Sequence, residues 1–315
     1  MAISEMHPVH RFEPWQVWPG SYDNKFVPGE YPHKKNQGLV IDKSTPVASM
    51  GSCFAREIRK VLIRENYNYI IKEAYHPASV HASAAWERTY NTFSMRQIFE
   101  YTFESFTPET RWWITPKTGQ VQDPYRRIIL YDSIEEAQKD FQSHIKCSKK
   151  AIMEAKVLIL TLGLTEIWED KKDKSVICLP SGPYFNEGAG KDEYSFRVSR
   201  YNENLENLET IYRIVKKYNK DCRLLITISP VHLWATFRDD MDVISANCNS
   251  KSTLRAVADE FVTNHDDVFY FPSYEIATNF TMMMNQTCFV KGKENFHINQ
   301  ETIELIMKHF FEFYG

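Results

Sequence analysis

Continuous apolar runs alternate with amphipathic segments along the second half of the chain. Three runs, KVLILTLG (156–163), CRLLITISPV (222–231) and VFYFPSY (268–274), are short and rich in β-branched or aromatic residues, which is typical of strands buried on both faces. Amphipathic segments with apolar residues at helical spacing occupy 134–155, 201–219, 249–265 and 300–313. This alternation predicts a mostly parallel sheet with helices on both faces.

The same pattern begins earlier, at the stretch TPVASMGSCFAREIRKVL (45–62). TPVAS (45–49) has the small and β-branched residues of a strand, and Phe54, Ile58 and Val61 follow at helical spacing. A tight turn at GSC (51–53) therefore joins a strand to a helix. We predict a flavodoxin-like three-layer α/β/α fold.

The remaining segments set the expected domain boundaries. Residues 1–44 have no clear hydrophobic period and are rich in Pro, Gly and aromatic residues, so we expect an irregular N-terminal arm. Residues 45–315 form the α/β domain, with an insertion at about 67–133. Within the insertion, 94–103 has helical spacing and the Pro-Lys-Thr-Gly of 112–123 predicts a hairpin.

Composition excludes several classes of protein. The 315 residues carry a formal net charge of −3, which lacks the basic excess of a nucleic-acid-binding surface. No stretch has the apolar length of a membrane span, and the start lacks the basic end and apolar run of a signal peptide. The six cysteines contain no Cys-x-x-Cys pair, which argues against a zinc site or a disulfide scaffold. We expect a cytoplasmic protein with no metal or cofactor.

The turns after the predicted strands are expected to share one rim. In parallel α/β sheets, ligands bind beyond the carboxyl ends of the strands. The segments there are GSC (51–53), GLTEIW (163–168), SPVHLW (229–234) and PSYE (272–275). Each carries a polar group that could face a ligand or simply cap a helix.

Ser52 and Cys53 are the potential nucleophiles on this rim. A residue at the start of a helix lies beside unpaired backbone N–H groups, where acyl-transfer chemistry needs a nucleophile and an anion stabiliser. The alternative for Ser52 is a helix cap. A thiolate at Cys53 would need a lowered pKa, but the first helical turn is expected to direct Cys53 into the interior. We therefore favour Ser52.

His297, just before the last predicted helix, is the expected base. An imidazole takes a proton from a hydroxyl when a third group fixes its tautomer. Glu294, three residues earlier, is close enough to do so. Taken singly, a surface histidine and a solvated acid explain both residues.

These motifs together resemble the GSCFA family. The GSCFA string at 51–55, GLTE, SPV and the Glu-x-x-His near the end carry the resemblance, from about residue 45 onward. That family belongs to the SGNH/GDSL hydrolase superfamily and is associated with bacterial polysaccharide biosynthesis. The resemblance implies that Ser52 is the nucleophile, His297 the base and Glu294 the orienting acid, with Glu in place of Asp.

The expected oxyanion and binding residues depart from the superfamily pattern. The motif that usually reads Gly-x-Asn is Gly163-Leu164-Thr165 here, and no glycine lies between 67 and 118 to supply the usual second motif. The Thr165 hydroxyl can donate a hydrogen bond through a shorter arm.

Two further rim residues have more than one expected role. Glu166 could bind sugar hydroxyls or pair with Arg126 or Arg127. His232 could contact substrate, compete as the base or be a packed histidine. Ser250 and Lys251 are expected to open a helix, so capping explains them best, although Lys251 could meet an anionic substrate.

The sequence thus predicts a serine-dependent esterase or O-acyltransferase that acts on an acylated, most simply acetylated, carbohydrate or polysaccharide precursor. One alternative is a non-catalytic carbohydrate-binding or assembly protein with a degraded SGNH site, and another is a Cys53 thiol enzyme. No nucleic-acid partner and no membrane span are expected. The acyl donor, the sugar and the oligomeric state stay open.

Overall fold

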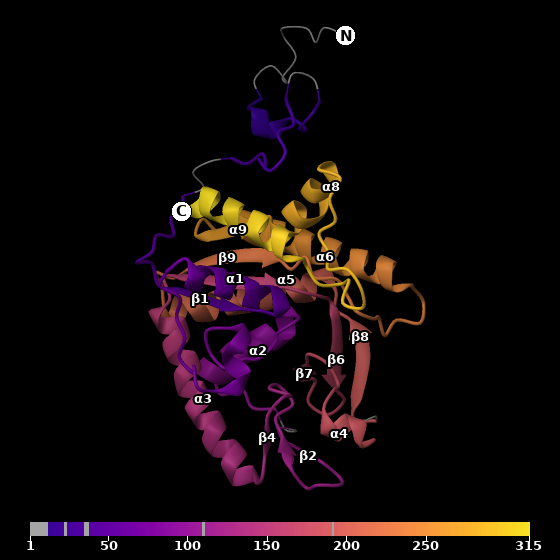
Figure 1. Ribbon diagram of the computed structural model, residues 1–315. Coiled ribbons are helices and arrows are strands. Elements are labelled where there is room, and N and C mark those ends of the chain that lie inside the picture. Colours follow the sequence, from indigo (N-terminus) through magenta and orange to yellow (C-terminus); the bar gives the residue numbers. More distant parts are fainter. Residues whose placement is uncertain (1–11, 22–23, 35–37, 109–110, 191) are drawn as a thin grey trace.

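A four-stranded parallel sheet forms the centre of the computed structural model, which describes residues 12–21, 24–34, 38–108, 111–190 and 192–315 (Figure 1). The strand order follows the chain. The strands are β1 (Val47–Met50), β5 (Val157–Leu162), β9 (Arg223–Ile228) and β10 (Val268–Phe271). The predicted parallel α/β architecture is confirmed.

Helices cover both faces of this sheet, in agreement with the predicted three layers (Figure 1). Because side chains alternate along a strand, Leu158 and Leu160 pack against one set of helices, whereas Val157 and Ile159 pack against the other. The first set comprises α2 (Thr92–Phe103), α3 (Ile134–Glu154), α5 (Tyr201–Tyr218) and α6 (Val243–Thr263). The second comprises α1 (Cys53–Arg64) and α9 (Gln300–Tyr314).

A short backbone contact extends the sheet beyond β1. Val47 N–H donates to Asn68 O at 2.9 Å and Ile70 N–H donates to Val47 O at 2.8 Å, which makes a parallel bridge between Val47 and Tyr69. The chain crosses from α1 to this position, so the order resembles the flavodoxin-like arrangement in which the second segment lies outside the first strand.

The segment 67–133 contains a small antiparallel sheet and the helix α2. The hairpin predicted at 112–123 is present, because the first two strands of this small sheet pair with each other in antiparallel fashion. The elements are η3 (Pro77–His81), β2 (Trp113–Ile114), β3 (Val121–Gln122) and β4 (Leu130–Tyr131).

A second antiparallel sheet was not predicted from the sequence. It consists of β6 (Glu166–Asp170), β7 (Val176–Ile177) and β8 (Tyr194–Val198), with the short helix α4 (Pro183–Asn186) before β8. The turn expected at GLTEIW therefore becomes a strand at Glu166. These strands mix charged and apolar residues and are short, so they lack the continuous apolar run that marks a doubly buried strand.

The described part of the N-terminal region has one short helix, η2 (Pro14–Gln16). Further along, that region lies against α9, where Lys308 Nζ donates to Gly29 O at 2.8 Å. A helical segment follows β10, with a π-turn between two short α-helices: α7 (Ser273–Glu275), η4 (Ile276–Phe280) and α8 (Thr281–Met283). Among the described residues, no helix combines the length and apolarity that crossing a bilayer requires.

Candidate active site

Gly51 allows β1 to pass directly into α1. A Cβ atom at this position would lie 2.7 Å from Thr161 Cβ and 2.9 Å from Ala55 Cβ, closer than real Cβ contacts allow. A larger residue at 51 would therefore displace β5 or the first turn of α1. The close approach fixes where Ser52 stands relative to the sheet.

Ser52 occupies the N-cap position of α1 without acting as a side-chain cap. Its hydroxyl accepts no hydrogen bond from the helix amides, whereas Ser133 at the start of α3 accepts one from Glu136 N–H at 3.1 Å. The Ser52 residue is only 4 % exposed. The capping alternative for its hydroxyl is thus not what the structure shows, and the hydroxyl stands beside the free amides of a helix N-terminus.

A cavity of about 330 Å³ joins the start of α1 to the loop that carries His297. Cys53 and Phe54 line it from α1, and Glu294 and His297 line it from the loop before α9. The sheet thus brings together residues about 240 positions apart in the chain, as the rim argument predicts.

His297 and Glu294 are neighbours without a hydrogen bond between their side chains. His297 Nδ1 lies 4.0 Å from Glu294 Oε2, beyond hydrogen-bond length. The Nδ1 atom is buried with no partner among the described residues, while the Glu294 side chain is 76 % exposed. The backbone closes a turn here, because His297 N–H donates to Glu294 O at 2.9 Å. A small rotation of the acid would bring the two groups into contact.

Cys53 corrects one sequence expectation. It was expected to point into the interior, but it is half-buried and lines the same cavity as His297. The first turn of α1 directs Phe54 and Ala55 into the core instead. A thiol therefore stands in the cavity beside the candidate serine.

Thr165 is engaged in the interior. Its N–H donates to Ser250 Oγ at 3.2 Å, its hydroxyl lies 2.8 Å from the same atom, and the residue is 1 % exposed. The neighbouring Gly163 donates its N–H to Tyr90 O at 3.1 Å, and a Cβ there would lie 2.6 Å from that oxygen. The role of Thr165 as an oxyanion donor stays a prediction.

Glu166 does not pair with Arg126 or Arg127, so that expectation was wrong. Its carboxylate accepts hydrogen bonds from the Thr236 hydroxyl at 2.5 Å and from Phe237 N–H at 3.2 Å. The two arginines pair within the insertion, with Asp123 and Glu87 respectively. Glu166 therefore anchors the loop after β9 to the start of β6.

His232 is a packed histidine on the rim. Its backbone N–H donates to the backbone carbonyl of Phe296 at 3.1 Å, and its ring centroid lies 4.2 Å from that of Phe289. Burial lowers its pKa to about 4, and the charge of Lys251 adds to this effect. His232 lines a separate cavity of about 430 Å³ rather than the one that His297 lines.

Lys251 is a buried cation that sequence reasoning placed wrongly. Because Asp242 caps α6 and the helix begins at Val243, Ser250 and Lys251 lie inside the helix and do not open it. Lys251 is 2 % exposed, and its Nζ donates to Gly163 O at 2.7 Å. Burial lowers its pKa to about 7. Within the described chain it makes no ion pair with a carboxylate.

Residues 83–91 cross the ends of β1 and β5, a feature that the sequence did not reveal. Ser49 N–H donates to Ser83 Oγ at 3.0 Å, and Thr89 N–H donates to Gly51 O at 3.0 Å. Asn91, at the start of α2, has a buried Nδ2 with no partner in the described part of the protein. This segment, which contains no glycine, lies beside the turn that holds Ser52.

Comparison with known families agrees with the motifs. A sequence model of the GSCFA family matches residues 46–310, a span that includes Ser52, Glu294 and His297. A search of the curated proteins found no significant match.

Proposed function

The chain belongs to the GSCFA family, and from this membership and the site geometry we propose that it is a serine-dependent ester-processing enzyme. It would be an esterase or O-acyltransferase for an acylated, most simply acetylated, carbohydrate or polysaccharide precursor. One observation supports this proposal most directly. The Ser52 hydroxyl makes no capping hydrogen bond at the start of α1, and the next two residues of that helix, Cys53 and Phe54, line the cavity that His297 also lines.

The proposed reaction begins with attack of Ser52 Oγ on the acyl carbonyl carbon. His297 takes the hydroxyl proton as the new C–O bond forms, and the carbonyl oxygen becomes an oxyanion. Collapse of the tetrahedral species breaks the ester bond, and the alcohol leaves with the proton from His297. A second attack on the acyl-Ser52 ester, by water or by a sugar hydroxyl, gives hydrolysis or acyl transfer.

The free amides at the start of α1 support this chemistry electrostatically. The Ser52 N–H and the first helix amides offer hydrogen-bond donors and the positive end of a helix dipole to a developing oxyanion. Glu294 would steady the imidazolium of His297 once the 4.0 Å gap between Nδ1 and Oε2 closes.

A non-catalytic carbohydrate-binding role is the second candidate. Two observations favour it: the open His297–Glu294 pair, and the engagement of Thr165 with Ser250. A site that retains the fold but lacks a working base would bind a sugar without opening an ester.

Intact-protein mass after incubation with a fluorophosphonate or with p-nitrophenyl acetate tests the proposal. We expect one adduct on the wild type and none on Ser52→Ala or His297→Ala. Ser133→Ala, which removes a hydroxyl from another helix start, is the matched control and should label normally. Cys53→Ala should also label normally.

Other outcomes point elsewhere. An adduct that persists in Ser52→Ala would contradict the serine mechanism, and one lost only in Cys53→Ala would support the thiol alternative. A folded wild type that takes no adduct but binds acetylated glycans would favour the non-catalytic role.

A further inference from the structure

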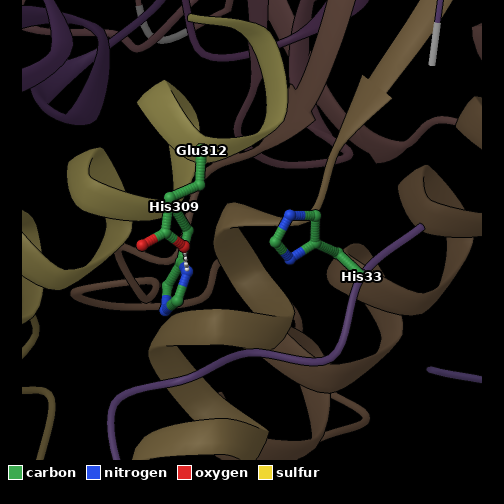
Figure 2. Close-up of side chains that lie close together, drawn as sticks. All are labelled: His33, His309 and Glu312. Atoms are coloured by element: carbon green, nitrogen blue, oxygen red, sulfur yellow. Dashed lines mark hydrogen bonds and ion pairs between the residues drawn. The ribbon is translucent and has the colours of Figure 1, made fainter. Parts of the chain in front are cut away.

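Three metal-ligating side chains meet where the N-terminal region crosses the last helix, away from the candidate active site. One ring nitrogen each from His33 and His309 and a carboxylate oxygen of Glu312 lie within 4.8 Å of one another. Figure 2 shows the ring of His33 reaching toward α9, which carries the other two side chains one turn apart. We propose that these residues bind a divalent transition-metal ion of the zinc class, which clamps the N-terminal region to α9.

The hydrogen bonds of His33 leave a free lone pair. Its Nδ1 lies 2.9 Å from Tyr31 O, and since a carbonyl only accepts, Nδ1 carries the proton. The Nε2 atom is then the one with the lone pair, and it is buried with no hydrogen-bond partner among the described residues. Metal-binding histidines commonly show this arrangement, in which the other ring nitrogen donates to a backbone carbonyl.

His309 and Glu312 form a preassembled pair on α9. His309 Nδ1 lies 2.7 Å from Glu312 Oε2, and His309 is fully buried, with an Nε2 that likewise lacks a partner in the described chain. Burial lowers the pKa of His309, although the carboxylate of Glu312 opposes the shift. The neutral imidazole is the form that binds metal.

Packing positions both imidazoles before any ion binds. The His33 ring stacks on Phe313 with a centroid distance of 4.1 Å, and the His309 ring lies against Phe280 and Tyr31. The Glu312 side chain is 40 % exposed, so an ion can enter from solvent. It would come through the groove of about 1000 Å³ that His33 and Glu312 help to line.

The donor set selects the kind of ion. Two imidazole nitrogens and one carboxylate oxygen suit Zn²⁺ and its neighbours, whereas Ca²⁺ and Mg²⁺ prefer oxygen ligands. Zinc bonds of about 2.0–2.1 Å need ligand atoms roughly 3.3 Å apart in a tetrahedron. His309 Nδ1 and Glu312 Oε2, 2.7 Å apart, are close to this spacing and would separate slightly around an ion. Binding through His309 Nδ1 would move the ring proton to Nε2, replace the hydrogen bond to Glu312 with two metal bonds and draw His33 toward α9.

Zinc titration of chelator-treated full-length protein tests the clamp. We expect one equivalent of Zn²⁺ to bind, with a higher melting temperature and slower proteolytic cleavage of the N-terminal region, because binding to the folded state stabilises it. Co²⁺ should give visible absorption bands of a nitrogen- and oxygen-ligated site. His33→Ala and Glu312→Gln should each weaken Zn²⁺ binding at least tenfold.

A second histidine–carboxylate pair supplies the matched control. His265 Nε2 lies 2.9 Å from Glu209 Oε2, and this pair belongs to no metal-competent cluster in the described chain. His265→Ala should therefore leave the zinc affinity unchanged. Glu312 is partly exposed, so Glu312→Gln keeps the test interpretable if His33→Ala folds poorly.

Two results would overturn the proposal. The first is a folded, chelator-treated wild type that takes up no Zn²⁺ at micromolar concentration. The second is an affinity that stays the same in both cluster variants, which would assign binding to other histidines. Neither result bears on Ser52 labelling.

Discussion

Two histidine–glutamate pairs in this protein are built in opposite ways. His144 Nδ1 lies 2.8 Å from Glu73 Oε2, and both side chains are buried, whereas His297 and Glu294 stand 4.0 Å apart at a cavity. Burial lowers the pKa of His144. Burial alone would raise the pKa of Glu73, but the hydrogen bond from His144 and weaker favourable contacts together outweigh it, and the pKa of Glu73 is lowered. A neutral ring therefore donates to a carboxylate in the first pair.

The surroundings of the two pairs also differ, because buried polar groups surround the first pair and a cavity adjoins the second. Glu73 also accepts from Ala85 N–H at 2.6 Å, and the nearby Asp123 pairs with Arg111 at 2.8 Å and with Arg126 at 2.9 Å. The first pair thus belongs to a buried network of hydrogen bonds and ion pairs. At the cavity, His297 Nδ1 has no hydrogen-bond partner among the described residues, and Ser52, just before the lining residue Cys53, leaves its hydroxyl out of the helix cap. A buried, paired polar network stabilises a fold, whereas an unpartnered polar atom beside a cavity is available to a substrate.

The sharpest test compares the two histidines by stability. His144→Ala should lower the free energy of unfolding by about 3–5 kcal/mol, because it leaves a cavity and a buried carboxylate that has lost its histidine partner. His297→Ala should change it by about 0.5 kcal/mol or less, since the ring is partly exposed and makes no side-chain hydrogen bond to any described residue. Urea unfolding followed by circular dichroism measures both. Equal losses would remove the distinction.

Lys251 extends the comparison to a buried cation at the rim. Its pKa of about 7 in the folded protein lies below the ordinary 10.5, so the unfolded chain binds more protons between these values. The free energy of unfolding should therefore rise with pH in that window, by up to about 1.4 kcal/mol per pH unit from this group. Below pH 7 the buried charge destabilises the fold fully.

Lys251→Met should flatten that pH dependence and make the protein more stable than the wild type at pH 7. Lys156→Met, at an exposed lysine 3.7 Å from Asp221, is the control and should keep the slope. Urea unfolding between pH 6 and about 9 gives the result. An unchanged slope in Lys251→Met would show that Lys251 keeps an ordinary pKa.

Glu294 should show the smallest effect. Because it is mostly exposed and lies beyond hydrogen-bond length, Glu294→Gln should slow fluorophosphonate labelling only about tenfold, far less than His297→Ala. Glu301→Gln, at an exposed acid in the first turn of α9, should label at the wild-type rate. A loss as complete as that of His297→Ala would mean that the pair closes tightly when a ligand binds.

The sequence predicts the central sheet and its helices well because burial dictates their pattern. The run 157–162 is apolar at nearly every position, since both of its faces are covered. The rim position of Ser52 and His297 follows from the same argument, because parallel strands direct their carboxyl ends to one edge. These features depend on local pattern and general topology.

Contacts between distant segments could not be predicted in this way. Thr165 and Ser250 are 85 residues apart, and nothing in either local sequence indicates their hydrogen bond. The early start of α6 moved Lys251 from an expected helix opening into the buried rim. The orientation of Cys53 depends on which residues of the first turn of α1 enter the core, and these are Phe54 and Ala55. Such details arise from tertiary packing.

The bridge between Val47 and Tyr69 bears on self-association. An uncovered edge of a parallel sheet offers backbone N–H and C=O groups to any other extended chain, which is a route to aggregation. Here Asn68 O and Ile70 N–H occupy that edge at β1 and then the chain turns away, so the pairing is too short to be copied by a neighbour. The segment 68–70 thus protects the β1 edge from pairing with a strand of another molecule.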